Sequence, residues 1–275
     1  MWRWLTQTWH ELDEQAAGLR QAQTSTGEPA RTGVPTPQQL LVIAAVLMSL
    51  GFGLGDLPFF QAELAPRLRR LLAGGQRTAF DTYSDLIGYS YWACCKLVEY
   101  GMVPAVHLWI VGGRLRDFGL RRPRLDRLPI RHIYLLCFVA LFPALIWLSR
   151  TQSFQQTYPF YREAARSLPE LVLWETQYAA TFLAVEFFFR GYLLFGLYRS
   201  LGSLAIFVSA LPYCLIHIGK PVPEMLGSIV AGILLGTLAL RTGSIWGGVG
   251  LHVGVALSMD LLSLRASGLL GRLFH

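Results

Sequence analysis

Long apolar runs constrain this chain more than any other feature of its sequence. A helix that crosses the hydrocarbon core of a bilayer needs about 20 mostly apolar residues. Because a helix pairs its backbone polar groups within one segment, such runs predict an all-α fold, a polytopic transmembrane helical bundle. Seven segments approach or exceed the required length: 39–60, 85–112, 132–149, 170–198, 203–217, 223–240 and 244–264. If Pro104 divides the second segment into two helices, the bundle has eight spans instead of seven.

The charged residues are few, and their placement points to a membrane. Charged side chains make up 15% of the chain, against about 25% in soluble domains. The net charge is +7, and one loop between two apolar segments holds seven arginines: Arg114, Arg116, Arg121, Arg122, Arg124, Arg127 and Arg131. Basic loops beside spans are typical of the cytoplasmic side of a membrane, where they face anionic headgroups. We therefore expect the lipid bilayer as a partner, no nucleic acid, and a cytoplasmic N-terminus.

An N-terminal arm, residues 1–38, precedes the membrane domain at 39–264, and a short tail follows at 265–275. In the arm, apolar residues recur every three or four positions: Trp2, Leu5, Trp9, Leu12, Ala16 and Leu19. This period predicts an amphipathic helix, which either lies in the membrane interface or packs on the protein. Residues 21–38 have the composition of a flexible linker.

Ionisable groups inside the apolar segments are candidates for function, because each costs roughly 2.5–3.5 kcal/mol to insert. Glu186 and Arg190 lie in the run AVEFFFRGYLLFGL, residues 184–197. Their i,i+4 spacing places both side chains on one helix face, where Arg190 can hold Glu186 ionised. The pair alone fits a structural ion pair as well as a catalytic one.

Two histidines on the following segments extend this candidate site. His217 ends the segment 203–217, and His252 lies within 244–264. A carboxylate can take a proton from water, while imidazoles orient that water or stabilise an oxyanion. Two histidines and one glutamate also match the ligands of a catalytic zinc ion. The residues therefore permit either a metal-free glutamate hydrolase or a zinc hydrolase that uses Glu186, His217 and His252.

Two further carboxylates in these segments lie at other depths. Asp260 follows His252 by about 12 Å along a helix, and Glu175 precedes Glu186 by about 16 Å. We expect neither to act directly on the reacting water, although Asp260 and the nearby Ser258 are the polar residues that follow His252.

The order of these motifs resembles the CAAX-protease and bacteriocin-processing family (CPBP, also called Abi), which includes the type II CAAX prenyl endopeptidases. The run 185–191, VEFFFRG, is similar to the family motif EExxxR followed by Gly. The run 213–217, YCLIH, is similar to FxxxH. His252 matches the last motif, a His followed four residues later by Asn. LRDFGL at 115–120 and ALRTGSIWGGVGLH at 239–252 also look like this family, and the core motifs fall within 170–264.

The chain departs from the family pattern at two positions. Val185 stands where the family has the glutamate usually assigned as the catalytic base, and Ala256 stands where it has the Asn. Either Glu186 has taken over the role of the base, or catalysis is impaired.

The resemblance implies a multi-pass protease of the cell membrane, in a bacterium the inner membrane, that hydrolyses a membrane-associated or lipid-modified protein or peptide without a cofactor. In this interpretation Glu186 activates water and Arg190 positions Glu186. His217 and His252 orient the water and stabilise the oxyanion, and all four face one polar cavity. The alternatives are a zinc protease built on the same residues and a non-catalytic scaffold or immunity protein that retains the fold.

Overall fold

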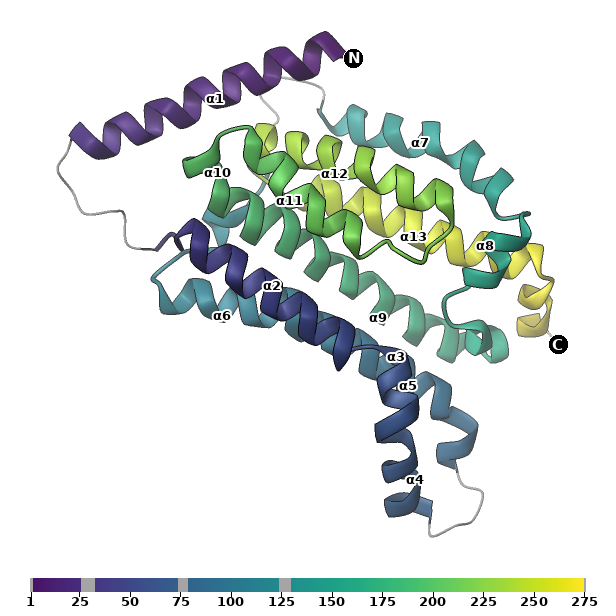
Figure 1. Cartoon of the computed structure of the whole chain (residues 1–275). Helices are drawn as coiled ribbons and strands as arrows, with labels where there is room; N and C mark the ends of the chain where they lie inside the picture. The colour runs from purple at the N-terminus through teal and green to yellow at the C-terminus, as the bar shows by residue number, and fades with distance from the viewer. Residues whose placement is uncertain (1, 26–32, 74–78, 124–129, 275) are drawn as a thin grey trace.

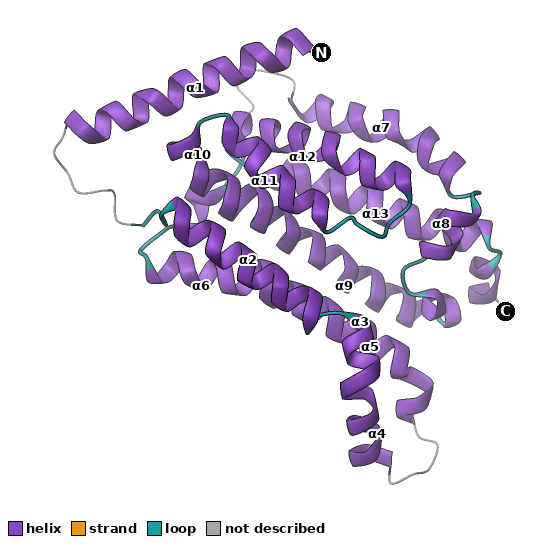
Figure 2. Ribbon diagram, in the orientation of Figure 1, coloured by secondary structure: helices purple, strands orange, loops and turns teal. Residues whose placement is uncertain are grey.

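All regular secondary structure in the described residues is helical, which confirms the all-α prediction (Figure 2). The structure is a computed structural model and describes residues 2–25, 33–73, 79–123 and 130–274. The first half of the chain contains α1 (Trp2–Ser25), α2 (Pro37–Gly53), α3 (Leu57–Phe59), η1 (Phe60–Leu64), α4 (Ala65–Ala73), α5 (Ala79–Leu97), η2 (Val98–Met102), α6 (Val103–Ile110) and η3 (Leu115–Phe118). The second half contains α7 (Ile130–Leu148), α8 (Gln152–Thr157), η4 (Arg162–Arg166), α9 (Leu168–Glu186), η5 (Phe187–Phe195), α10 (Gly196–Leu201), α11 (Leu204–Leu215), α12 (Val222–Thr242), α13 (Trp246–Ala266) and η6 (Leu269–Phe274).

The helices begin where the sequence offers caps. The Thr36 side chain accepts a hydrogen bond from the backbone N–H of Gln39, and the Gln39 side chain accepts one from the N–H of Thr36. This reciprocal pair satisfies two donors that a helix start leaves free, and Pro37 has no N–H to satisfy. Ser167 likewise caps α9 by accepting from the N–H of Glu170. The caps therefore define the first residue of α2 and of α9.

Within the described residues, three helices are long and apolar enough to cross a membrane: Leu168–Leu201, Val222–Thr242 and Trp246–Ala266. A fourth arises if α2 and the helix Leu57–Leu72, which meet at 46°, count as one broken span. Two shorter apolar helices, His132–Leu148 and Leu204–Leu215, lie within predicted segments. The protein is thus a polytopic helical membrane protein, and the count of seven or eight spans stays a prediction.

Helical structure runs from Ala79 to Ile110 without the break considered at Pro104. The five residues before Val103 and Pro104 form the π-helical segment η2 instead. A π-turn inserts a residue into a helix and so accommodates local misfit in the hydrogen-bond ladder. The sequence therefore specifies one irregular helix here.

The helix α9–η5–α10 occupies the centre of the bundle (Figure 1). The protein buries 78% of the apolar stretch of this helix, against 39% for that of α12 and 33% for that of α13. It contacts α5, η2 and α2 on one side and α11, α12 and α13 on the other. Because neighbours surround this helix, its polar side chains are the ones shielded from lipid.

The N-terminal helix α1 packs on the protein, which decides between the two placements that its amphipathic period allowed. Thr8, Leu12 and Ala16 are buried on its inner face. The indole N–H of Trp9 donates to the hydroxyl of Thr237 on α12 at 3.1 Å. The helix continues to Ser25, into the range assigned to the linker, and residues 26–32 of that range lie outside the described residues.

Candidate active site

Glu186 and Arg190 form an ion pair in the centre of the bundle. The Arg190 Nη1 donates to Glu186 Oε1 at 2.9 Å, and Glu186 is 0% exposed and Arg190 2% exposed. Glu186 is the last residue of α9, and Arg190 lies in the π-helical η5 that follows. π-Helical turns occur frequently at functional sites. The predicted i,i+4 pair is therefore present at the junction of two helix types.

His252 on α13 completes a three-residue cluster with this pair. Its Nδ1 lies 2.9 Å from Glu186 Oε1, the same oxygen that accepts from Arg190. The other oxygen, Oε2, is buried and has no hydrogen-bond partner among the described residues. Arg190 Nη2 is buried and unpartnered as well. One carboxylate oxygen is thus fixed by two donors, while the second retains its full capacity to accept a proton.

Gly248 provides the space around Glu186 Oε2. A Cβ at Gly248 would lie 2.8 Å from Glu186 Oε2, closer than real Cβ contacts come. Gly248 belongs to the glycine-rich run that precedes His252. The backbone of α13 therefore approaches the carboxylate more closely than a side chain would allow.

His217 reaches the cluster through Tyr213 and not by direct contact. Its Nδ1 lies 2.9 Å from the backbone oxygen of Tyr213 on α11. The ring of Tyr213 lies beneath the guanidinium of Arg190, with 3.8 Å between the Arg190 Cζ and the ring centroid. Its centroid is 4.7 Å from that of His217 and 6.0 Å from that of His252. Tyr213 therefore connects Arg190, His217 and His252, whereas the sequence pattern indicated it only as a substitute for the Phe of the family motif.

The partners of the two histidines indicate where their protons lie. In each ring Nδ1 faces an acceptor, the Tyr213 carbonyl or the Glu186 carboxylate. Nδ1 therefore carries hydrogen, and Nε2 of a neutral ring is an acceptor. A neutral histidine in this tautomer can orient a water or take its proton, but only the imidazolium form can donate from Nε2 to an oxyanion.

The segment LRDFGL at 115–120 packs against the helix that carries the ion pair. A Cβ at Gly191 would lie 2.8 Å from the backbone oxygen of Phe118. The backbone oxygen of Gly119 accepts from the N–H of Ile245, just before α13, at 3.0 Å. The glycine after Arg190 thus allows this segment to close one end of the site and to link η5 with α13.

The two positions that depart from the family pattern are apolar, and the polar residues after His252 bind other groups. Val185 and Ala256 are buried among apolar side chains. Ser258 donates within its own helix to the Gly254 oxygen at 2.7 Å. Asp260 accepts from the N–H of Phe160 at 3.1 Å and from the indole of Trp174 at 3.2 Å. Neither Ser258 nor Asp260 makes a contact with the Glu186 cluster, so the acceptor chemistry centres on Glu186.

The geometry gives the zinc alternative no support. Among the described residues, no three His, Cys, Asp or Glu side chains are arranged to hold a metal ion. His252 Nδ1 binds Glu186 Oε1 directly, and the Arg190 guanidinium donates a hydrogen bond to the same oxygen. The cation that neutralises the carboxylate here belongs to the protein itself.

Fold and site together define the class: a polytopic helical membrane protein with a buried site built on one glutamate. Residues 168–258 match the family described as type II CAAX prenyl endopeptidase Rce1-like, and the chain therefore carries a domain of this CPBP (Abi) family. The match runs from the first turn of α9 into α13 and contains Glu186, Arg190, His217 and His252. No curated protein and no solved structure matches the chain. The family relationship implies intramembrane proteolysis and a protein substrate.

Proposed function

We propose that the protein is an intramembrane endopeptidase that hydrolyses peptide bonds of a membrane-associated or lipid-modified protein with water activated by Glu186. The observation that carries this proposal is the asymmetry of the Glu186 carboxylate. Arg190 and His252 hold Oε1 at 2.9 Å each, which fixes the group and favours its ionised form. Oε2 has no hydrogen-bond partner in the described part of the chain and can accept the proton of a water that attacks the substrate carbonyl.

The remaining residues support this chemistry in separate ways. Arg190 is a positioning residue, because it acts through the carboxylate that it binds. Tyr213 holds Arg190 from below and fixes His217 through its backbone oxygen. His217 and His252 offer Nε2 to the same reaction: as neutral rings they accept a hydrogen bond from the water and orient it while its proton goes to Glu186, and a ring in the imidazolium form donates to the oxyanion.

The proposed orientation places the α1 end of the bundle in the cytoplasm. The Nε of Arg121 donates to the backbone oxygen of Gly243, at the end of α12 where Arg241 pairs with Glu11 of α1. The basic loop and α1 therefore share one end, and basic segments favour the cytoplasmic side. In a bacterial host this membrane is the inner membrane.

The test uses purified full-length protein in detergent with a fluorogenic prenylated peptide, chosen because the family is described by that substrate. Hydrolysis should occur, should survive chelation of divalent metals, and should be lost in Glu186→Gln. Activity that is lost on chelation and restored by zinc would establish the metal alternative. Equal activity in wild type and Glu186→Gln would refute the assigned base.

A non-catalytic role is the second candidate, and two observations favour it. Val185 and Ala256 replace the family's polar residues with side chains that pack in apolar surroundings. In this case the Glu186–Arg190–His252 cluster only holds α9, η5 and α13 together. Glu186→Gln would then lower the free energy of unfolding, and no variant or substrate would reveal hydrolysis.

A further inference from the structure

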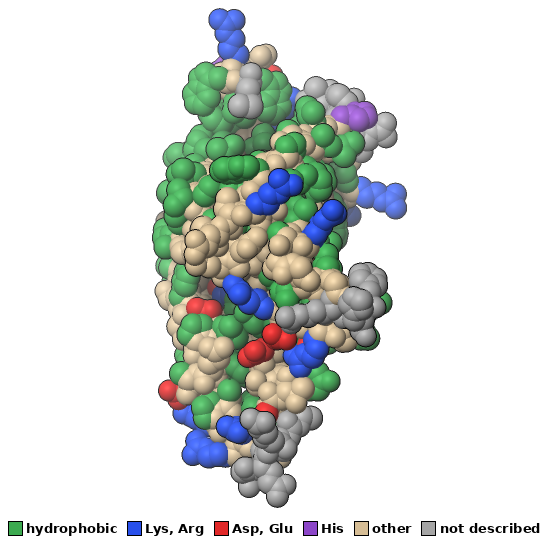
Figure 3. Space-filling model, turned by 90° about the vertical axis from the view of Figure 1, so that its right-hand side faces the viewer, with side chains coloured by type: hydrophobic (Ala, Val, Ile, Leu, Met, Phe, Trp, Pro, Cys, Tyr) green, Lys and Arg blue, Asp and Glu red, His purple; other side chains and the backbone are tan. Residues whose placement is uncertain are grey.

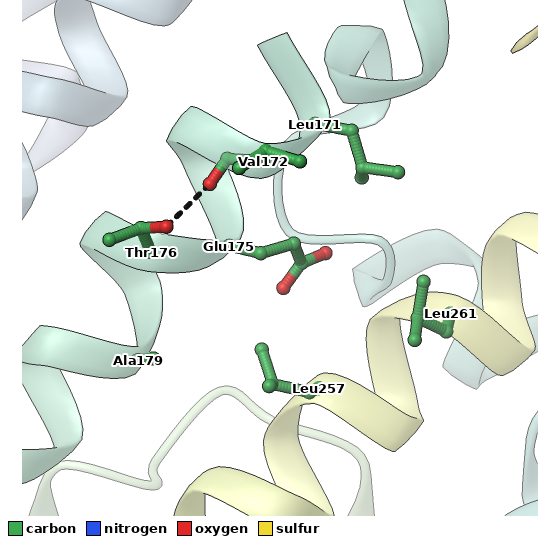
Figure 4. A pocket seen from close by; sticks show the side chains of 7 residues that line it. All are labelled: Leu171, Val172, Glu175, Thr176, Ala179, Leu257 and Leu261. Atoms are coloured by element: carbon green, nitrogen blue, oxygen red, sulfur yellow. Dashed lines mark hydrogen bonds between the residues drawn. The ribbon is translucent and has the colours of Figure 1, made fainter. Parts of the chain in front are cut away.

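Glu175 is a half-buried carboxylate on α9 that lies between Glu170 and Glu186 in the sequence. Glu175 lines a groove of about 410 Å³ between α9 and α13, together with Thr176, Ala179, Leu257 and Leu261 (Figure 4). Neither of its carboxylate oxygens has a hydrogen-bond partner in the part of the chain that the structure describes, and both are shielded from solvent. An ionisable group in a span is costly unless it is paired, so its partner is expected from outside the protein.

The groove lies on the outer side of the bundle and is otherwise apolar. Val172 and Leu261 on its rim are 56% and 42% exposed. The Thr176 hydroxyl donates to the backbone oxygen of Val172 at 2.7 Å, so it offers a ligand no free donor (Figure 4). Asp260 is close enough to act electrostatically on Glu175, and it adds negative charge. An occupant that fits this surface is apolar and has a cationic group.

The groove lies on the same helix as the proposed catalytic cluster, and its lining on α9 ends at Ala179. Glu175 and Glu186 are both on the α-helical part of α9, on nearly the same face and about 16 Å apart along the axis. Phe182 lies between them, one turn beyond Ala179, and its ring centroid is 4.5 Å from that of His252. A chain that extends from the groove along α9 toward Glu186 would therefore pass Phe182.

We propose that the groove binds an apolar segment of the protein substrate and that Glu175 pairs with a Lys or Arg side chain in that segment. The register rests on the proposed proteolysis: a strand advances about 3.3 Å per residue, which places the basic residue about five positions from the cleaved bond. An amine-bearing lipid headgroup offers the same charge, but the line from Glu175 past Phe182 to Glu186 favours the peptide.

The binding test uses full-length Glu186→Gln protein in phosphatidylcholine nanodiscs, so that no cleavage is needed. The probes are two fluorescent apolar peptides that differ at one position, with lysine in one and acetyl-lysine in the other. The lysine peptide should bind about 10- to 100-fold more tightly, the range for a buried hydrogen bond to a charged group. This preference should disappear in the background Glu175→Gln and persist with Thr176→Val, the matched control from the same groove.

Several outcomes would overturn the proposal. Equal binding of the two peptides to folded Glu186→Gln protein would do so, because Glu175 is intact there. A lysine preference that survives Glu175→Gln would assign the cation to another group. Displacement of both peptides by phosphatidylethanolamine, without a lysine preference, would make the occupant a lipid.

A second readout separates this proposal from the proposed function. With wild-type enzyme, moving the lysine along the peptide should move the cleaved bond with it. Binding preference without any cleavage would retain the groove as a cation site and refute proteolysis. Cleavage that ignores the position of the lysine would refute the register set by Glu175.

Discussion

Glu186 and Asp260 are two carboxylates of the same bundle, both 0% exposed, yet their surroundings differ. Each oxygen of Asp260 accepts from one neutral N–H donor, one from Phe160 and one from Trp174. Glu186 has both of its donors on one oxygen, and one of them is a guanidinium. Asp260 therefore uses both of its oxygens as acceptors, while Glu186 uses one and leaves the other without a partner among the described residues.

Under the proposed function, this difference separates a carboxylate that builds the fold from one that acts on water. Asp260 connects α13 to α9 and to the segment before η4, whose Tyr158 oxygen also accepts from Ser263. That segment packs at the α8 end of the molecule, where basic and acidic side chains both occur among apolar ones (Figure 3). Burial alone therefore does not identify a functional acid; the arrangement of its donors does.

The largest expected effect is on Glu186. Glu186→Gln keeps the shape of the side chain but removes its ability to accept a proton. Hydrolysis should fall on the order of 10²–10⁴-fold. Product formation measured by mass spectrometry, with the fraction of folded protein determined in parallel, checks this. Loss of folded protein in proportion to lost activity would assign Glu186 a structural role like that of Asp260.

The next effect concerns the family position that Val185 occupies. Val185→Glu restores the family's glutamate pair but places a carboxylate among apolar side chains. We expect no gain in hydrolysis and a loss of stability of roughly 2.5–3.5 kcal/mol, the cost of an acid in a span. Thermal unfolding in detergent and the hydrolysis rate together decide. A rise in activity would mean that the base belongs at residue 185 and that the natural protein is impaired.

A smaller effect is expected at Asp260. Asp260→Asn turns an amide NH₂ toward one of two N–H donors, so one bond is lost and a donor remains unpaired. The free energy of unfolding should fall by about 1–3 kcal/mol. Activity per folded molecule should stay at the wild-type level. A drop in activity without a drop in stability would move Asp260 into the catalytic chemistry.

The smallest effect is expected at Tyr213. Tyr213→Leu removes the ring beneath Arg190, and a cation–π contact contributes about 0.5–2 kcal/mol, so activity should fall about 2- to 30-fold. Tyr213→Phe is the matched control, because it keeps the ring and the backbone oxygen that binds His217. The ratio of the two rates isolates the ring. Equal losses in both variants would point to the tyrosine hydroxyl instead.

The sequence predicts the all-helical fold because length and hydropathy mark membrane helices, but only three or four of the seven predicted segments are long and apolar enough among the described residues to cross a membrane. It also predicts the Glu186–Arg190 pair, since helical spacing places them one turn apart. It does not show which oxygen of Glu186 is free, because that depends on how α13 packs at Gly248. The part of Tyr213 that holds His217 is a backbone oxygen, and no residue type signals such a contact. The placement of α1 was equally hidden, because an amphipathic period fits a lipid surface and a protein surface alike.

The docking of α1 sets an order of events during synthesis. Trp9 and its partner Thr237 are separated by 228 positions, and Asp13 binds Ser203 across 190. A chain made from its N-terminus therefore completes α1 long before either partner exists. Until α10 and the start of α11 have emerged, Leu12 and Ala16 lack the neighbours that cover them, because Tyr198 donates to the Leu12 oxygen and Gly202 lies beside Ala16. The first helix to be translated must wait for the last third of the protein, and a chain that stops before α10 would leave this helix as an uncovered amphipathic surface.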